Sequence, residues 1–241
     1  MHEHPIAAAA LELLLDATES VDVESALVTE SATYSALQAG PEHRAWLETH
    51  ARRRHAEEHD VVIASRDGPT LRLTLNRPHV RNAVNAAMRE ALLDGLLIAT
   101  VDPSVESIVI DGAGANFCSG GDLDEFGTLD NPASAHLLRV DRSVGRAVHE
   151  LRERTTVIVH GACVGAGVEI PAFAERVVAR SDATFRLPEI SMGLVPGAGG
   201  TVSIPRRVGR ERFAWLALTG AMIDAPTALT WGLVDEIIEG A

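Results

Sequence analysis

Hydrophobic and polar positions follow two different patterns along the chain, and the change falls near residue 60. Before it, alanine, leucine and glutamate recur at helical spacing without any strand pattern, so we predict two or three helices. The best defined are Ala7 to Thr18 and Glu42 to His59, with a break at Gly40-Pro41. We therefore expect a helical extension over residues 1–60 and a core of different texture over residues 61–241.

From Val61 onward, short segments with a strand pattern alternate with segments whose apolar residues recur at helical spacing. This pattern predicts an α/β core. Ligands are expected at the loops that follow the strands of such a core. The predicted strands are 61–65, 70–75, 108–111, 157–159, 176–179 and 184–185, the first two joined by a hairpin turn at 67–69. The predicted helices are 85–100, 134–152, 167–174, 210–218 and 225–230.

Composition narrows the possible functions of this chain of 241 residues. The formal charge is −13, and residues 1–60 carry twelve acidic residues against four arginines, so nucleic acids and anionic membranes are poor partners. No lysine occurs, which excludes Schiff-base chemistry. The two cysteines have neither metal-ligand nor disulfide spacing. The apolar stretch Ile6 to Leu15 is too short to cross a bilayer and contains Glu12, so we expect a cytoplasmic protein.

Two glycine-rich loops each follow a predicted strand, at Asn116 to Leu123 and at Gly161 to Glu169. Small residues before a helix start leave backbone N–H groups free to bind an oxyanion or a phosphate. Either loop alone is an ordinary strand-to-helix turn. Together they could offer one amide each to a single carbonyl oxygen.

Glu169 and Glu189 stand twenty residues apart, each beside glycines and apolar residues. Burial would raise the pKa of such a carboxyl group and suit it to proton transfer. Each glutamate taken alone is equally consistent with a capping or surface carboxylate, and Gly197 to Gly200 with a simple turn. Their joint occurrence predicts a paired acid/base site.

These motifs in this order resemble the crotonase, or enoyl-CoA hydratase/isomerase, superfamily. The matching segments are 76–85, 117–123, 161–169, 188–201 and 218–234, within Val61 to Ile238. The resemblance implies a crotonase-like ββα spiral core and acyl-CoA thioesters as substrates. It also implies a homo-oligomer, either a trimer or a hexamer. It implies no metal or other cofactor, since coenzyme A is part of the substrate.

The resemblance also implies roles for individual residues. The N–H groups of Ser119 and Ala166 would form an oxyanion hole for the thioester carbonyl. Glu169 and Glu189 would be the catalytic pair, and the N–H of Gly197 would orient the water. One carboxylate takes a proton from the water that attacks C3, and the other donates a proton to C2. Which glutamate does which is open, because coupled carboxylates titrate as a pair.

Five further residues are expected to contact the substrate. Arg77 and Arg81 are candidates for the coenzyme phosphates, although surface arginines near a helix start would look the same. Cys118, Gly120 and Asp122 belong to the first glycine-rich loop. No histidine lies near Cys118 in the sequence, and the resemblance gives it no role as a nucleophile.

Two features depart from the superfamily pattern. Members usually continue past the Trp231-Gly-Leu-Val234 segment with helices that cover the acyl pocket, and we expect the core to lack these C-terminal helices. The extension over residues 1–60 would then cover the same surface, with a partner subunit as the alternative. Ala166 stands where glycine is common, so its Cβ would narrow the cleft.

The presence of both glutamates favours hydration of trans-2-enoyl-CoA to 3-hydroxyacyl-CoA. Many superfamily members that keep the oxyanion hole lack one of the two glutamates and catalyse other reactions. An enoyl-CoA isomerase or an acyl-CoA hydrolase on the same scaffold is one alternative. A weakly catalytic acyl-CoA-binding subunit is another.

Overall fold

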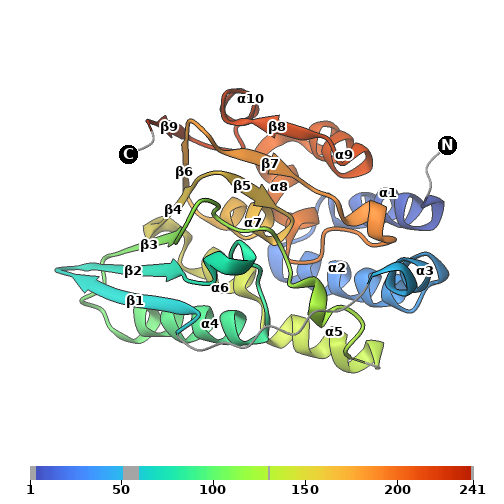
Figure 1. Ribbon diagram of the computed structural model, residues 1–241, viewed down its shortest axis with the longest axis horizontal. Coiled ribbons are helices and arrows are strands. Elements are labelled where there is room, and N and C mark those ends of the chain that lie inside the picture. Colours follow the sequence, from blue (N-terminus) through green and yellow to red (C-terminus); the bar gives the residue numbers. More distant parts are fainter. Residues whose placement is uncertain (1–3, 51–59, 130, 240–241) are drawn as a thin grey trace.

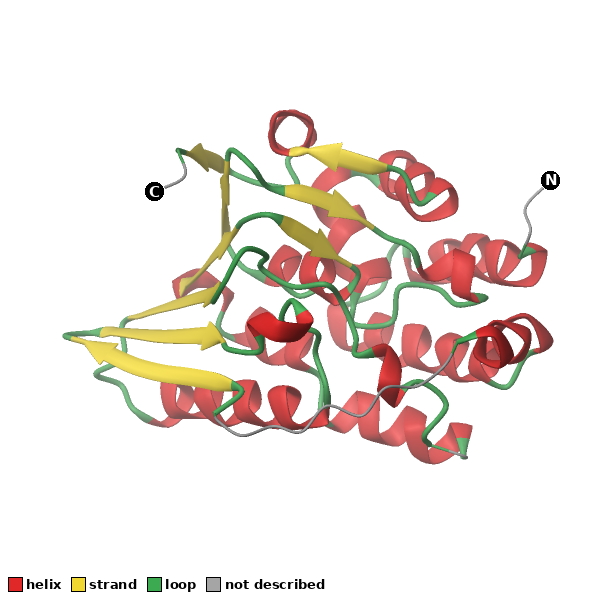
Figure 2. Ribbon diagram, in the orientation of Figure 1, coloured by secondary structure: helices red, strands yellow, loops and turns green. Residues whose placement is uncertain are grey.

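The computed structural model describes residues 4–50, 60–129 and 131–239, and within them it forms two sheets. The larger sheet has the strand order β1-β2-β3-β4-β6-β9, with bounds β1 Val62–Asp67, β2 Thr70–Leu75, β3 Ser107–Gly112, β4 Thr155–Val159, β6 Arg176–Arg180 and β9 Glu236–Ile238. The smaller has the order β5-β7-β8, with bounds β5 Ala162–Val164, β7 Thr184–Arg186 and β8 Met222–Asp224. The strands gather on the left and at the top of Figure 2.

The larger sheet is parallel except at its first edge, where β1 and β2 form the predicted hairpin. Gly68 makes the tight turn possible, because its φ of +54° is a conformation that few other residues adopt. The sheet buries alternate side chains of β2 and β4, as expected for strands with one packed face. The predicted α/β class is confirmed. The three short strands β5, β8 and β9 were not predicted separately.

Helices connect and cover the strands of the core. Their bounds are α4 Ala86–Val101, α5 Pro132–Asp141, α6 Val144–Glu150, α7 Ala166–Glu169, α8 Gly200–Val208, α9 Arg210–Thr219 and α10 Ala225–Trp231. Short 3-10 turns lie at η1 Pro78–Val80, η2 Leu123–Glu125, η3 Arg152–Arg154, η4 Pro171–Phe173 and η5 Glu189–Met192. In Figure 1, α4 and α5 run along the bottom of the molecule.

The helices of the core differ in detail from those predicted: the helix expected over 167–174 is divided into α7 and the 3-10 turn η4, and two further differences concern α5, α6 and α8. The single helix expected over 134–152 is divided into α5 and α6, because the Ser143 hydroxyl accepts a hydrogen bond from the N–H of Arg146 and starts a new helix. Helix α8 was not predicted, since it begins at Gly200 directly after a glycine-rich turn and contains Pro205. The turn and the helix are therefore one continuous unit.

The extension consists of α1 Pro5–Thr18, α2 Val23–Gln38 and α3 Pro41–Thr49. The helix predicted over Glu42 to His59 thus ends at Thr49, and residues 51–59 lie outside the described part of the chain. Helix α2 packs against α1, α5 and α8, and α1 also contacts α9. Leu11, Leu27 and other buried side chains of the extension belong to the same hydrophobic core as the sheets. Figure 1 shows these helices at the end of the molecule away from the β1–β2 hairpin.

Among the described residues, none of the helices combines the length and the apolar character that crossing a bilayer requires.

Candidate active site

A cavity of about 260 Å³ lies between the extension and the core. Its walls come from α2, α5, α6, α7, the turn at η5 and the glycine segment before α8. Five of the ten residues that the sequence singled out line it: Ala166, Glu169, Glu189, Gly197 and Asp122. The other five, Ser119, Arg77, Arg81, Cys118 and Gly120, do not.

Glu169 is the last residue of α7 and is 2% exposed. Its Oε2 atom accepts hydrogen bonds from the N–H groups of Ala198 at 2.7 Å and Gly200 at 2.9 Å. Burial raises the pKa of this carboxyl group to about 7, although the two amide donors oppose the rise. Among the described residues Oε1 has no hydrogen-bond partner, so one oxygen is anchored and the other is left for chemistry.

Glu189 begins η5 and also lines the cavity, and its Oε2 atom is buried without a hydrogen-bond partner among the described residues. Burial raises the pKa of Glu189 well above its usual value, and the charge of Glu169 raises it further. A buried carboxyl oxygen without a donor must find one in a ligand or carry a proton. Glu189 is therefore suited to hold and release a proton.

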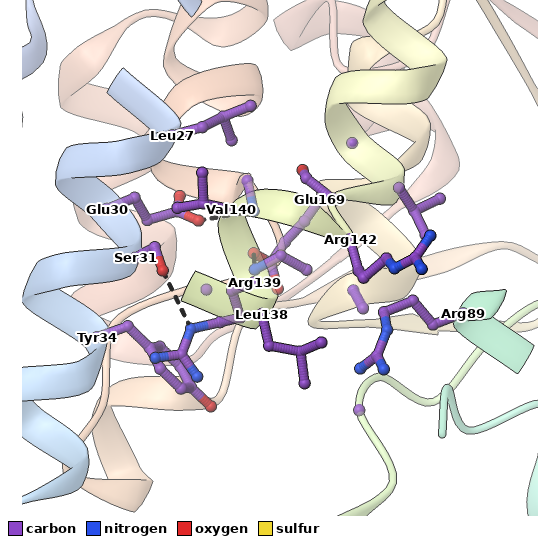
Figure 3. A pocket seen from close by; sticks show the side chains of 18 of the residues that line it. Leu27, Glu30, Ser31, Tyr34, Arg89, Leu138, Arg139, Val140, Arg142 and Glu169 are labelled. Atoms are coloured by element: carbon purple, nitrogen blue, oxygen red, sulfur yellow. Dashed lines mark hydrogen bonds between the residues drawn. The ribbon is translucent and has the colours of Figure 1, made fainter. Parts of the chain in front are cut away.

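A third buried carboxyl group, Glu30 of α2, reaches the same site and was not predicted. Its Oε1 accepts from Gly199 N–H at 2.8 Å, and its Oε2 accepts from Thr201 N–H at 2.9 Å and Thr201 Oγ1 at 2.6 Å. Burial first, and then the charge of Glu169, raise its pKa to about 8. In Figure 3, Leu27, Glu30 and Tyr34 project from α2 on the side of the cavity where Arg139 lies.

Helix periodicity carried a signal for Glu30. It stands on the buried face of α2 together with Ala26, Leu27, Tyr34 and Leu37, at spacings typical of one apolar stripe. A glutamate within an apolar stripe is rarely left buried unless it has partners. The abundance of acidic residues in the extension hid this exception.

Tyr34 closes the site above Gly197. A Cβ added to Gly197 would lie 2.2 Å from Tyr34 Cδ2, so only glycine allows this approach. The guanidinium of Arg139 lies over the Tyr34 ring, 4.7 Å from its centroid. Arg139 also donates to Ser31 Oγ at 3.3 Å and to Gln38 Oε1 at 3.0 Å, and it contacts Ser35. One side chain of α5 thus fixes α2 over the cavity.

The two glycine-rich loops lie side by side. The backbones of Cys118 and Cys163 pair as an isolated parallel β-bridge, and both thiols are free. A Cβ added to Gly167 would lie 2.4 Å from the carbonyl oxygen of Cys118. The N–H of Ala166, at the start of α7, has no hydrogen-bond partner among the described residues, and Ala166 lines the cavity. The N–H of Ser119 instead donates to the carbonyl oxygen of Arg81 at 2.9 Å. The two expected oxyanion donors are therefore not equivalent.

The remaining candidate residues have mainly structural contacts. Arg77 is 1% exposed and pairs with Asp122 at 2.9 Å, so its charge is used inside the protein and does not reach a surface phosphate. The Arg81 side chain is exposed. Burial raises the pKa of the Cys118 thiol to about 12, which keeps it protonated and unsuited to attack a thioester. Gly120, with φ of +98°, approaches the carbonyl oxygen of Val164 and helps to hold the two loops together.

Comparison with known proteins places these features in a family. The model of the enoyl-CoA hydratase/isomerase family matches residues 67–240. The 2,3-dehydroadipyl-CoA hydratase of Escherichia coli is 36% identical over 176 residues, which cover 73% of this chain and 68% of that protein. The mevalonyl-coenzyme A hydratase sidH of Aspergillus fumigatus is 32% identical over 70% of this chain, and there the match spans 63% of the relative's length.

Solved structures agree with the sequence comparison. The crystal structure of an enoyl-CoA hydratase from Thermoplasma volcanium superimposes with a TM-score of 0.70 at 33% identity, covering 76% of this chain and 73% of that one. An enoyl-CoA hydratase from Mycobacterium smegmatis gives a TM-score of 0.70 at 30% identity, over 75% of this chain and 71% of that one. The predicted crotonase-like core with a helical N-terminal region is thereby confirmed. The chain belongs to the enoyl-CoA hydratase/isomerase family of the crotonase superfamily.

Proposed function

We propose that this family member hydrates trans-2-enoyl-CoA thioesters to 3-hydroxyacyl-CoA, with Glu169 and Glu189 as the acid/base pair. The observation that carries the proposal is the pair of buried carboxyl groups lining one cavity, each with a raised pKa. Relatives named as hydratases support the same reaction type.

The raised pKa values suit a reaction that needs one acid and one base. Neighbouring buried carboxylates repel each other, so the cluster holds at least one proton near neutral pH. One ionised glutamate removes a proton from water as the oxygen of that water bonds to C3. The electrons of the double bond move towards the thioester carbonyl, and the protonated glutamate supplies the hydrogen at C2. One water is added in total, and the two glutamates exchange protonation states.

Negative charge on the thioester oxygen requires hydrogen-bond donors at the opposite wall. The free N–H of Ala166 at the first turn of α7 is suited to this role. The N–H of Ser119 can take part only if its bond to the Arg81 carbonyl is shared or opened. In this proposal the entering thioester carbonyl competes with Arg81 for that donor.

The extension supplies the cover of the acyl pocket in this proposal. Leu27 and Tyr34 of α2 line the cavity together with Phe126 and Leu138, which gives an acyl chain apolar walls. The exposed side chain of Arg81 remains our candidate for a coenzyme phosphate. We also propose a homo-oligomer.

One observation favours isomerisation as a second candidate. Among the described residues Glu189 Oε2 has no donor, whereas Glu169 is held by two amides. A single carboxyl group without a fixed partner suffices to move a proton between two carbons. An isomerase would shift a double bond without taking up water.

An assay with paired substrates separates the two reactions. The full-length protein is incubated with crotonyl-CoA and, separately, with a 3-enoyl-CoA. Loss of the conjugated-enoyl absorbance together with formation of 3-hydroxybutyryl-CoA supports hydration. Appearance of conjugation from the 3-enoyl substrate without hydroxyacyl product identifies an isomerase. Absence of turnover on both substrates, with coenzyme A still bound, would contradict both reactions and leave a binding subunit.

A further inference from the structure

The backbone N–H groups of four consecutive residues, 198–201, are divided between two glutamates. Those of Ala198 and Gly200 point to Glu169, and those of Gly199 and Thr201 point to Glu30. Gly199 makes this alternation possible with its φ of +101°, a conformation that favours glycine. These donors lie at the start of α8, where the amide groups have no partner within the helix and where negative charge is stabilised.

The two glutamates come from different parts of the chain. Glu169 lies within the segment that matches the family model, residues 67–240, whereas Glu30 lies in the extension outside it. Glu30 is 2% exposed, and both of its oxygens are occupied by donors of one segment. A side chain added by the extension therefore completes the hydrogen bonding of a backbone segment that also holds Glu169.

We propose that Glu30 is a positioning residue of this site: its carboxylate holds segment 197–201 so that the amides of Ala198 and Gly200 stay on Glu169, and its charge acts on the neighbouring glutamates. The inference rests on the proposed function, because it assigns Glu30 to the reaction of Glu169 and Glu189. Glu30 itself does not touch the reacting atoms.

The groups that act on Glu30 come from every element around it. Glu169 on α7 and Glu189 on η5 repel its charge. Burial is the main cause of the raised pKa values of both. Arg139 on α5 attracts it, and Tyr34 is the titratable neighbour on its own helix. His136 on α5 is hydrogen-bonded to the Oγ atom of Ser31, the residue that follows Glu30. From α8 it receives neutral donors, the N–H and hydroxyl of Thr201.

Replacing Glu30 by glutamine tests the charge while preserving the shape of the side chain. Where Glu30 is ionised, loss of its negative charge removes repulsion, so the proton affinity of Glu169 and Glu189 falls. Because the pKa of Glu30 is raised to about 8, the alkaline limb of the pH profile of kcat/KM should move to lower pH, by on the order of one pH unit, and the acidic limb should stay in place. The amide of glutamine also presents a donor to the N–H groups, so kcat at the optimum should fall by about tenfold or more.

Glu12→Gln is the matched control, since it makes the same chemical change at an exposed position of α1 in the same extension. Its pH profile and kcat should equal those of the unaltered protein. Thr201→Val removes one of the three donors to Glu30 and keeps the glutamate. Because a lost donor disfavours the charged form of Glu30, this variant should shift the profile in the same direction by less. If Glu30→Gln does not fold, the pH profile of Thr201→Val tests the proposal in its place.

Hydrogen–deuterium exchange of peptides covering residues 197–208 gives a readout that does not require turnover. Glu30→Gln should speed exchange at this segment, whereas Glu12→Gln should not. If the unaltered protein turns over no enoyl thioester, the proposed function fails while exchange still tests the hold on the segment. A uniform rate loss with an unmoved pH profile, or unchanged exchange in a folded Glu30→Gln variant, would overturn the proposal.

Discussion

Glu169 and Glu189 are both carboxyl groups of one cavity, but their hydrogen bonds give them different freedom. Two amide donors fix the Oε2 atom of Glu169, whereas the Oε2 atom of Glu189 is buried without a donor among the described residues. A fixed carboxylate is oriented towards its substrate, and an unpartnered one readily takes up a proton. Proton affinity and geometry thus differ between chemically identical side chains.

Glu189→Gln should lower kcat for enoyl-CoA hydration by about a hundredfold or more, in line with the usual contribution of general acid/base groups. Folding should be preserved, because an amide replaces a buried carboxyl group of equal size without burying a charge. Steady-state kinetics and thermal unfolding of the same preparation check both expectations. Glu169→Gln should behave similarly in kcat, and wild-type turnover in the two variants would contradict the assigned pair.

Gly165→Ala should disturb Glu189 and weaken the fold. Gly165 has φ of +51°, and an added Cβ would lie 2.5 Å from Glu189 Oε1. A non-glycine residue in such a conformation costs roughly 1–3 kcal/mol of stability. The displaced carboxyl group should also lower kcat, and urea unfolding together with kinetics measures both effects.

Gly209→Ala is the matched control for backbone strain alone. Gly209 has φ of +85°, but nothing lies within 4 Å of the added Cβ. It should lose stability while keeping kcat. If both variants lost kcat equally, the effect at Gly165 would come from general loosening of the fold, which is not what the contact with Glu189 predicts.

Sequence reasoning found residues of the site where motifs mark them and missed the residue that no motif marks. Glu169 and Glu189 belong to glycine-bearing motifs, and the structure brings both to one cavity. Glu30 lies in a regular helix of an acidic extension, and its partners are 169 and 171 residues away along the chain. Only the tertiary packing of α2 on α8 brings them together. Arg77 shows the opposite error, since its burial could not be seen from the sequence.

At the scale of elements, α2 is held over the cavity by α5. Arg139 of α5 stacks on Tyr34 and donates to Ser31 and Gln38, so one guanidinium spans about two turns of α2. Sequence periodicity predicted helices here, but not the division at Ser143, where α6 begins after α5. The cap at Ser143 involves residues close together in the sequence, whereas the packing of α5 on α2 joins residues far apart. Only the cap leaves a signal in the local sequence.

Arg139→Met should detach α2 in part. The change removes charge-assisted hydrogen bonds and a cation–π contact while keeping an apolar stem, so a loss of about 2 kcal/mol in the free energy of unfolding is expected. KM for an acyl-CoA substrate should rise, because Tyr34 would no longer be held over Gly197. Urea unfolding and limited proteolysis of the extension measure the effect.

Arg176→Met serves as its control. Arg176 of β6 pairs with Glu236 of β9 at the edge of the larger sheet, and not with a residue of α2. Its side chain is 56% exposed. Exposed ion pairs contribute about 0–1 kcal/mol, so this variant should change stability little and KM not at all. A similar rise in KM in both arginine variants would contradict a specific role for the contact between α5 and α2.

At the scale of the whole molecule, the three glutamates whose carboxyl groups have raised pKa values make stability depend on pH. Their pKa values are raised in the folded state, to about 7 for Glu169 and about 8 for Glu30. A raised carboxyl pKa means that the folded state binds its proton more tightly than the unfolded state. The resulting stability is present below the unfolded value of 4.5 and is lost as pH rises through the folded values.

Other groups oppose this trend at lower pH. Burial lowers the pKa of His43 and of His149, so their protonation below 6.5 destabilises the folded state. Asp22, Asp102 and Asp224 have lowered pKa values through hydrogen bonds to nearby donors, and their contribution is lost as pH falls through those values. Maximum stability should therefore lie at intermediate pH.

The contribution of Glu30 can be isolated by comparing the unaltered protein with Glu30→Gln at a series of pH values. Because glutamine does not titrate, the difference in unfolding free energy should turn against the unaltered protein as pH rises from 4.5 to about 8. Its slope should approach at most about 1.4 kcal/mol per pH unit, the value for one proton. Urea unfolding measures it, with Glu12→Gln as the flat reference. A pH-independent difference would mean that Glu30 has the same proton affinity folded and unfolded, and that burial beside Glu169 leaves its charge unaffected.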